Sequence, residues 1–133
     1  MLAIKKIMLD TNIFDKIPDF FGEMKDSIRE GYEYYITVVQ VEELSKIPES
    51  KEGKRFKSEE ILSRLKVEVL PSSSIFHGES DRALNSIDDS IIAATSVYEG
   101  CTLVTEDKEL YEYMKEDNLK VMYFDEFLLE ISN

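Results

Sequence analysis

Cysteine and histidine are almost absent from this chain of 133 residues. It contains one cysteine, Cys101, and one histidine, His77, and it has no tryptophan. A single cysteine cannot form an internal disulfide bond, and a zinc site built from several thiolates or imidazoles is also excluded. Any chemistry that the chain performs must therefore use carboxylates, hydroxyls, amides or lysines.

Long hydrophobic runs are also missing. No stretch approaches the roughly 20 apolar residues that a membrane-spanning helix needs. The first residues, MLAIKKIML, lack the longer apolar segment of a secretory signal peptide. We therefore expect no membrane association and a cytoplasmic location.

Positive charge is scarce, because 28 acidic residues against 16 basic ones give a net charge of −12. Such a charge disfavours indiscriminate binding to nucleic acids, so a nucleic-acid function needs a divalent metal, a local basic patch, or both. Residues 46–66 hold a local excess of seven bases over four acids. There, Lys46, Lys54, Arg55 and Lys57 are candidates for contacting RNA or a protein partner. The alternative interpretation is a solvated loop and helix face.

Segments typical of strands and of helices alternate along the whole chain. Apolar, aromatic or β-branched stretches predict strands at 4–9, 32–39, 67–70, 101–105 and 121–124. Helical spacing and breakers predict helices at 18–30, 41–47, around 61–65, and at 86–100, 106–118 and 125–131. This alternation predicts a single domain over residues 1–133, a three-layer α/β/α sandwich around a parallel sheet of about five strands.

Acidic residues stand at places where such a fold forms ligand sites, beyond the carboxyl ends of the strands. Asp10 follows the first predicted strand, and Asp107 follows the fourth. Helices that begin at the same edge add acids from their first turns, namely Glu42 or Glu43, and Asp88 or Asp89.

Each acid taken alone has a structural explanation, since Asp is a favoured helix N-cap and carboxylates interact well with the first turn of a helix. Four chain segments that bring acids to one edge need a further explanation, because clustered carboxylates repel one another unless a cation compensates. Mg²⁺ or Mn²⁺ suits a set of oxygen ligands without histidine or cysteine.

Four short motifs, LDTNIF, VEEL, DDSIIAA and LVTED, occur in this order and in the predicted strand or helix context. Together they resemble the PIN-domain nucleases, a family that includes the toxin ribonucleases of VapC-type toxin–antitoxin pairs. The resemblance implies a PIN-like fold and metal-dependent hydrolysis of RNA with Mg²⁺ or Mn²⁺. It also implies a homodimer and, for a toxin, an antitoxin partner.

The family's functional positions fall on particular residues of this chain. The resemblance assigns catalysis and metal binding to four acids: Asp10, Glu43, Asp89 and Asp107. It assigns supporting roles to Asn12, Thr105 and Asp88. Helical periodicity alone leaves Glu42 and Glu43 equivalent, because both flank an apolar stripe formed by Val38, Val41, Leu44 and Ile47.

The same residues argue against two other acid-using α/β families. A haloacid dehalogenase-type phosphatase needs a second aspartate where Asn12 stands, and a response-regulator receiver needs a lysine after a late strand, where Glu106 stands. Two alternatives stay open: a PIN-like module that binds RNA or protein without cleaving it, and an RNA-processing nuclease outside a toxin system.

Overall fold

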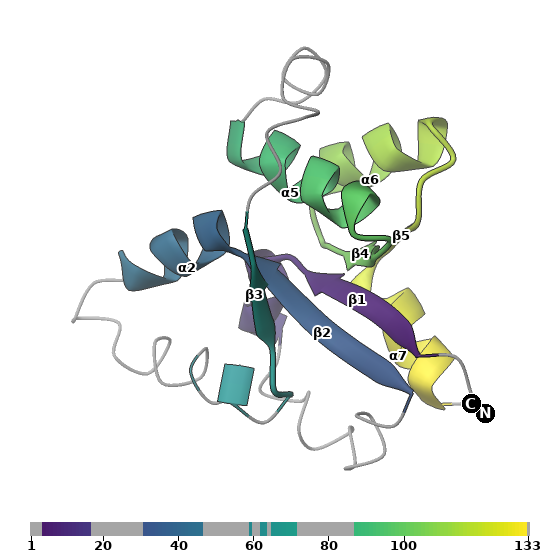
Figure 1. Cartoon of the computed structure of the whole chain (residues 1–133). Coiled ribbons are helices and arrows are strands. Elements are labelled where there is room, and N and C mark those ends of the chain that lie inside the picture. Colours follow the sequence, from purple (N-terminus) through teal and green to yellow (C-terminus); the bar gives the residue numbers. More distant parts are fainter. Residues whose placement is uncertain are drawn as a thin grey trace.

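The computed structural model describes residues 4–16, 31–46, 59, 62–63, 65–71 and 87–132. They form a five-stranded, wholly parallel sheet in the order β3-β2-β1-β4-β5, with helices packed on its two faces (Figure 1). The strands are β1 Lys5–Leu9, β2 Tyr32–Thr37, β3 Glu68–Leu70, β4 Thr102–Val104 and β5 Val121–Met122. The predicted α/β class and parallel sheet are confirmed.

The helices connect and cover these strands. They are the 3-10 helix η1 Thr11–Lys16, α2 Val38–Ser45, α5 Ile87–Tyr98, α6 Lys108–Glu116 and α7 Phe124–Ser132. The short η1 directly after β1 was not predicted. The helix predicted at 18–30 lies outside the described residues. Of the helix predicted around 61–65, Leu62 and Ser63 are described and helical and Leu65 lies in a turn, whereas residues 61 and 64 lie outside the described part.

Two of the predicted strands end two residues earlier than expected. The strand expected at 32–39 ends at Thr37, because this residue caps α2. The Thr37 hydroxyl accepts a hydrogen bond from the Gln40 backbone N–H, and the Gln40 side chain accepts one from the Thr37 N–H. This reciprocal pair starts a helix where β-branched residues alone favour continuing the strand. Phe124, expected in the last strand, instead begins α7.

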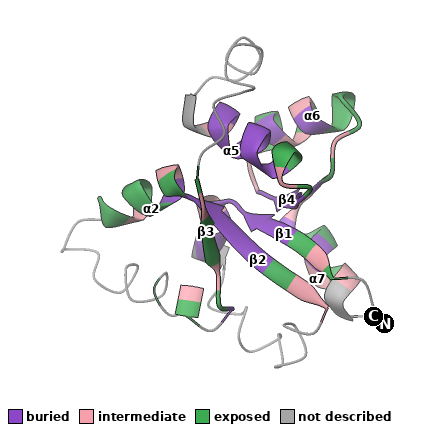
Figure 2. Cartoon of the chain, in the orientation of Figure 1, coloured by how far each residue is buried: buried purple, intermediate pink, exposed green. Residues whose placement is uncertain are grey.

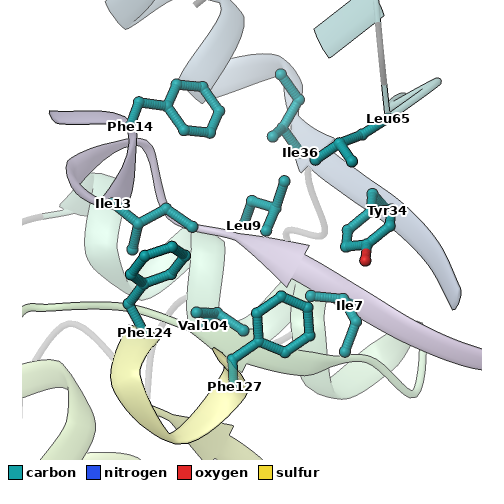
Figure 3. Close-up of a cluster of buried hydrophobic side chains, with 10 residues drawn as sticks. All are labelled: Ile7, Leu9, Ile13, Phe14, Tyr34, Ile36, Leu65, Val104, Phe124 and Phe127. Atoms are coloured by element: carbon teal, nitrogen blue, oxygen red, sulfur yellow. The ribbon is translucent and has the colours of Figure 1, made fainter. Parts of the chain in front are cut away.

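The core lies on both faces of the sheet because side chains of a strand alternate between them. On one face, Ile7 and Leu9 of β1 pack with Tyr34 and with Phe127 of α7 (Figure 3). On the other face, Met8 packs with residues of α5 and α6. Figure 2 shows that burial is concentrated in the carboxyl-terminal parts of β1 and β2 and along most of α5.

Candidate active site

The site predicted from the sequence lies where the order of the strands changes direction. From β1 the chain continues to β2 and β3 on one side, and it then crosses to β4 on the other side of β1. Asp10 and Thr105 directly follow β1 and β4, and the Asp10 N–H donates to the Val104 carbonyl at 3.0 Å. Ligands of open α/β sheets bind beyond the carboxyl ends of the strands at such a switch point.

The Thr105 hydroxyl connects the residues of this edge. It donates a hydrogen bond to Asp10 Oδ2 at 2.8 Å, and it accepts from the Asp107 N–H at 3.0 Å and from Asn12 Nδ2 at 3.4 Å. One donor and two acceptor positions use the full capacity of a hydroxyl. Asn12 Oδ1 in turn accepts from the Glu106 N–H at 3.2 Å. The fold therefore joins four predicted site residues in one network.

Asp10 is buried at the centre of this network, with only 6% of its surface exposed. Burial raises the pKa of its carboxyl above the ordinary 3.8, and the charge of nearby Asp107 raises it further, whereas the hydrogen bond from Thr105 lowers it. The ionised form of Asp10 is therefore held at a cost, and a bound cation would remove that cost.

Asp107 has a structural role as well as a place in the site. It is the N-cap of α6, and its Oδ1 accepts hydrogen bonds from the Glu109 and Leu110 N–H groups at 3.0 and 3.2 Å. The capping explanation considered for each acid thus holds for this one. Capping keeps the carboxylate in a fixed position next to Thr105.

The other predicted acids lie on helices that begin at the same edge of the sheet (Figure 1). Glu43 is exposed on α2, and Asp89 is half-buried in the first turn of α5. The side chain of Asp88 lies outside the described part of the structure. Among the residues that are described, no group of three or more acidic, histidine or cysteine side chains is close enough together to hold a metal ion.

The predicted basic surface is only partly described. Lys46 is exposed at the end of α2, whereas Lys54, Arg55 and Lys57 lie outside the described residues. The apolar stripe predicted for α2 is wrong in part, because Val38 and Val41 are 42% and 39% exposed. The α2 side chain that is fully buried is that of Gln40.

Gln40 is the positioning residue that sequence analysis missed. Its amide nitrogen donates to the carbonyl of Leu9, the residue before Asp10, while its amide oxygen accepts from Thr37. The side chain thus fixes the start of α2 to the end of β1. A signal was present, because Thr37-Val-Val-Gln40 has the Thr-x-x-Gln spacing of a capping box.

Replacing Gln40 by leucine is expected to destabilise the protein by about 1–3 kcal/mol, because the buried Leu9 carbonyl and Thr37 N–H lose their partners. Urea unfolding would measure this loss. Glu42→Gln, on the exposed side of the same helix, is the matched control and should change stability by less than about 0.5 kcal/mol. Equal stability of the two variants would refute the anchoring role of Gln40.

The raised pKa of Asp10 gives a prediction for stability without metal. Between the ordinary 3.8 and the raised value, the folded protein binds more protons than the unfolded chain, so its stability falls as pH rises. In EDTA at neutral pH, Asp10→Asn should therefore be at least as stable as wild type. This advantage should shrink as pH falls towards 3.8. Thermal unfolding at several pH values measures it, and a loss of several degrees at neutral pH would contradict the prediction.

Comparison with known proteins identifies the family. The model of the PIN domain matches residues 7–116, so the chain belongs to the PIN-domain family. PIN domains are in general nuclease folds. No curated protein matches the chain in sequence. In the described part of the chain, none of the helices is long and apolar enough to cross a membrane.

Solved structures show the same fold at low sequence identity. VapBC2 from Rickettsia felis, bound to a DNA fragment from its promoter, contains a chain that is 24% identical, with a TM-score of 0.68 and coverage of 90% of this chain and 99% of that one. A protein from Pyrobaculum aerophilum is 16% identical, with a TM-score of 0.69 and 96% coverage of both chains. The PIN domain endonuclease Utp24 is also 16% identical, with a TM-score of 0.60 and coverage of 89% and 84%.

Proposed function

We propose that this protein is a divalent-metal-dependent endoribonuclease that hydrolyses RNA phosphodiester bonds at the carboxyl edge of its sheet. One observation carries the proposal: a buried Asp10, joined through Thr105 to Asp107, lies at the switch point of a PIN domain. A buried acid with a raised pKa beside a second acid is typical of a functional site rather than of a packing position.

The residues that would bind the ion fit Mg²⁺ or Mn²⁺, because they supply carboxylate oxygens, the ligands that hard divalent cations prefer. Asp10 and Asp107 are the residues of this network that would hold the ion, with Glu43 and Asp89 contributed from α2 and α5. When bound, such an ion polarises a phosphodiester and stabilises the departing oxygen. The chain's own contribution is to orient Asp10 through Thr105 and to fix the 105–107 turn through Asn12.

The phase of α2 supports Glu43 over Glu42 as the acid contributed by this helix. Gln40 faces the end of β1, since its side chain donates to the Leu9 carbonyl. A helical residue shares its face with the residues three and four positions further on, which here are Glu43 and Leu44. Glu42 lies two positions from Gln40 and so points away from Asp10.

Metal removal tests the proposed activity directly. Purified protein should cleave a labelled single-stranded RNA in Mn²⁺ or Mg²⁺. Cleavage should stop in excess EDTA and resume when the metal is restored. A DNA strand of the same sequence, assayed in parallel, tests the assignment to RNA. Cleavage that persists in EDTA would contradict the proposed metal dependence, and absence of cleavage with either metal would favour the non-catalytic RNA- or protein-binding module.

The biological role that we propose is that of a toxin ribonuclease in a toxin–antitoxin pair, acting in the cytoplasm as a homodimer. The similarity to the VapBC2 structure supports this choice over an RNA-processing nuclease. Lys46, Lys54, Arg55 and Lys57 are the proposed contacts for RNA or for the antitoxin. Growth arrest on expression, relieved by the product of a small adjacent gene, would support the toxin role, and light scattering would measure the oligomeric state.

A further inference from the structure

The sheet is stepped at the amino ends of its strands, the edge opposite the candidate active site. β1 begins at Lys5, but its pairing with β4 begins only at Ile7, which lies opposite Thr102. β5 contributes only two residues, Val121 and Met122. The first two residues of β1 thus extend past β4 and β5, and a hollow forms beside them.

This hollow is a cavity of about 890 Å³. Its charged lining comprises four lysines and one acid: Lys5, Lys6, Lys115, Lys120 and Glu99. The rest of the wall is mainly apolar and includes Ile4, Leu119 and Val121. Lys5 and Lys6 come from β1, whereas Lys115 and Lys120 come from the end of α6 and from the turn before β5, more than a hundred residues further along the chain.

The cationic character of this cavity contrasts with the net charge of −12. Lys5 forms an ion pair with Glu130 at 2.6 Å. Lys6 and Lys115 lie over the rings of Tyr35 and Tyr111, at 6.0 and 5.6 Å from the ring centroids. No carboxylate in the described part of the chain pairs with Lys6, Lys115 or Lys120. The charges of these three ammonium groups are therefore not neutralised by an ion pair.

Helix ends explain only part of this charge. The last turns of α5 and α6 close with Gly100 at a φ of 71° and Asn118 at a φ of 58°, and the following N–H groups bond back to the Ser96 and Met114 carbonyls. Helix carboxyl ends favour nearby cations, which accounts for Lys115 in the last turn of α6. Lys6 and Lys120 lie outside these helices. Stabilisation of a helix carboxyl end therefore does not account for their charge.

We propose that this cavity binds a nucleotide, with its phosphate held by Lys6, Lys115 and Lys120 and its base against the apolar wall. A cavity of about 890 Å³ is much larger than a phosphate ion needs and lies within the usual range for small-molecule sites. Asp10 lies five residues along β1 from Lys5, about 16 Å at about 3.3 Å per residue. The site is therefore separate from the proposed cleavage site and goes beyond the proposed function.

Calorimetric titration in EDTA tests this proposal without any cleavage. The probes are AMP, its two parts adenosine and inorganic phosphate, and a six-nucleotide single-stranded RNA. AMP should bind more tightly than either part. The variant Lys6→Gln/Lys120→Gln should weaken AMP binding by at least about tenfold, the effect of losing charge-assisted contacts to the phosphate. Lys108→Gln, at the opposite end of α6 and 80% exposed, removes one similar charge and should leave binding unchanged.

Each outcome separates the alternatives. Binding of AMP would show that the cavity accepts a free nucleotide. If only the RNA binds, and the double variant abolishes that binding, the cavity accepts a nucleotide within a strand. The proposal is wrong if neither AMP nor the RNA binds at millimolar concentration. It is also wrong if phosphate binds as tightly as AMP, or if Lys108→Gln weakens binding as much as the double variant does. Because no metal is present, these results are independent of nuclease activity.

Discussion

Asp10→Asn is expected to reduce RNA cleavage in Mn²⁺ by at least about a hundredfold, because it removes the buried negative charge on which the proposed metal site depends. Asparagine has nearly the same shape and can still accept the hydrogen bond from Thr105. The loss should therefore appear without loss of folding. Initial rates of cleavage of a labelled RNA, with circular dichroism of the same samples, measure both.

The control for this variant is Asp125→Asn. Asp125 is exposed in the first turn of α7, so its replacement changes the net charge equally while leaving the site intact. Its rate should equal that of wild type. Equal rates for Asp10→Asn and wild type would show that the measured activity belongs to a contaminating nuclease or that Asp10 is not a catalytic residue.

Asp107→Asn separates the two roles of Asp107. Asparagine caps a helix about as well as aspartate does, so the bonds to the Glu109 and Leu110 N–H groups can persist. Cleavage should nevertheless fall strongly, since the charge beside Asp10 is lost. A variant with normal stability and normal activity would limit Asp107 to its role as a cap.

Phe127→Ala is expected to destabilise the fold by about 3–5 kcal/mol, the usual cost of removing a buried phenylalanine. Phe127 is fully buried, and its ring is nearly perpendicular to those of Tyr32 and Tyr34, with ring centroids 6.0 and 6.3 Å away. Figure 3 shows its ring between α7 and Ile7 of β1. Its loss leaves a cavity where α7 covers the sheet, so the melting temperature should fall by on the order of 10 °C.

Leu129→Ala is the matched control for Phe127→Ala. Leu129 lies on the same helix but is 69% exposed, so its truncation should cost less than about 0.5 kcal/mol. Chemical denaturation of both variants gives the comparison. Similar losses in the two would mean that the helical propensity of α7, and not the packing of Phe127 on the sheet, determines the effect.

The sequence by itself determined the alternation of strands and helices and the placement of acids after strands. These features depend on local patterns, such as the apolar run before Asp10 and the helical spacing around Leu110 and Met114, both of which are buried as α6 requires. Local patterns do not predict where each strand or helix ends. The reciprocal bonds between Thr37 and Gln40 end β2 two residues before the β-branched run does.

Only the tertiary structure decided which of these residues meet. β1 pairs with β4, although their residues are more than 90 positions apart, and this pairing brings the Thr105 hydroxyl to Asp10. Asp10 is buried in this arrangement, and burial raises the pKa of its carboxyl. The lysine-lined cavity arises in the same way, from a step in strand register. Contacts of this kind follow from how surfaces fit together, and no local pattern in a single segment specifies them.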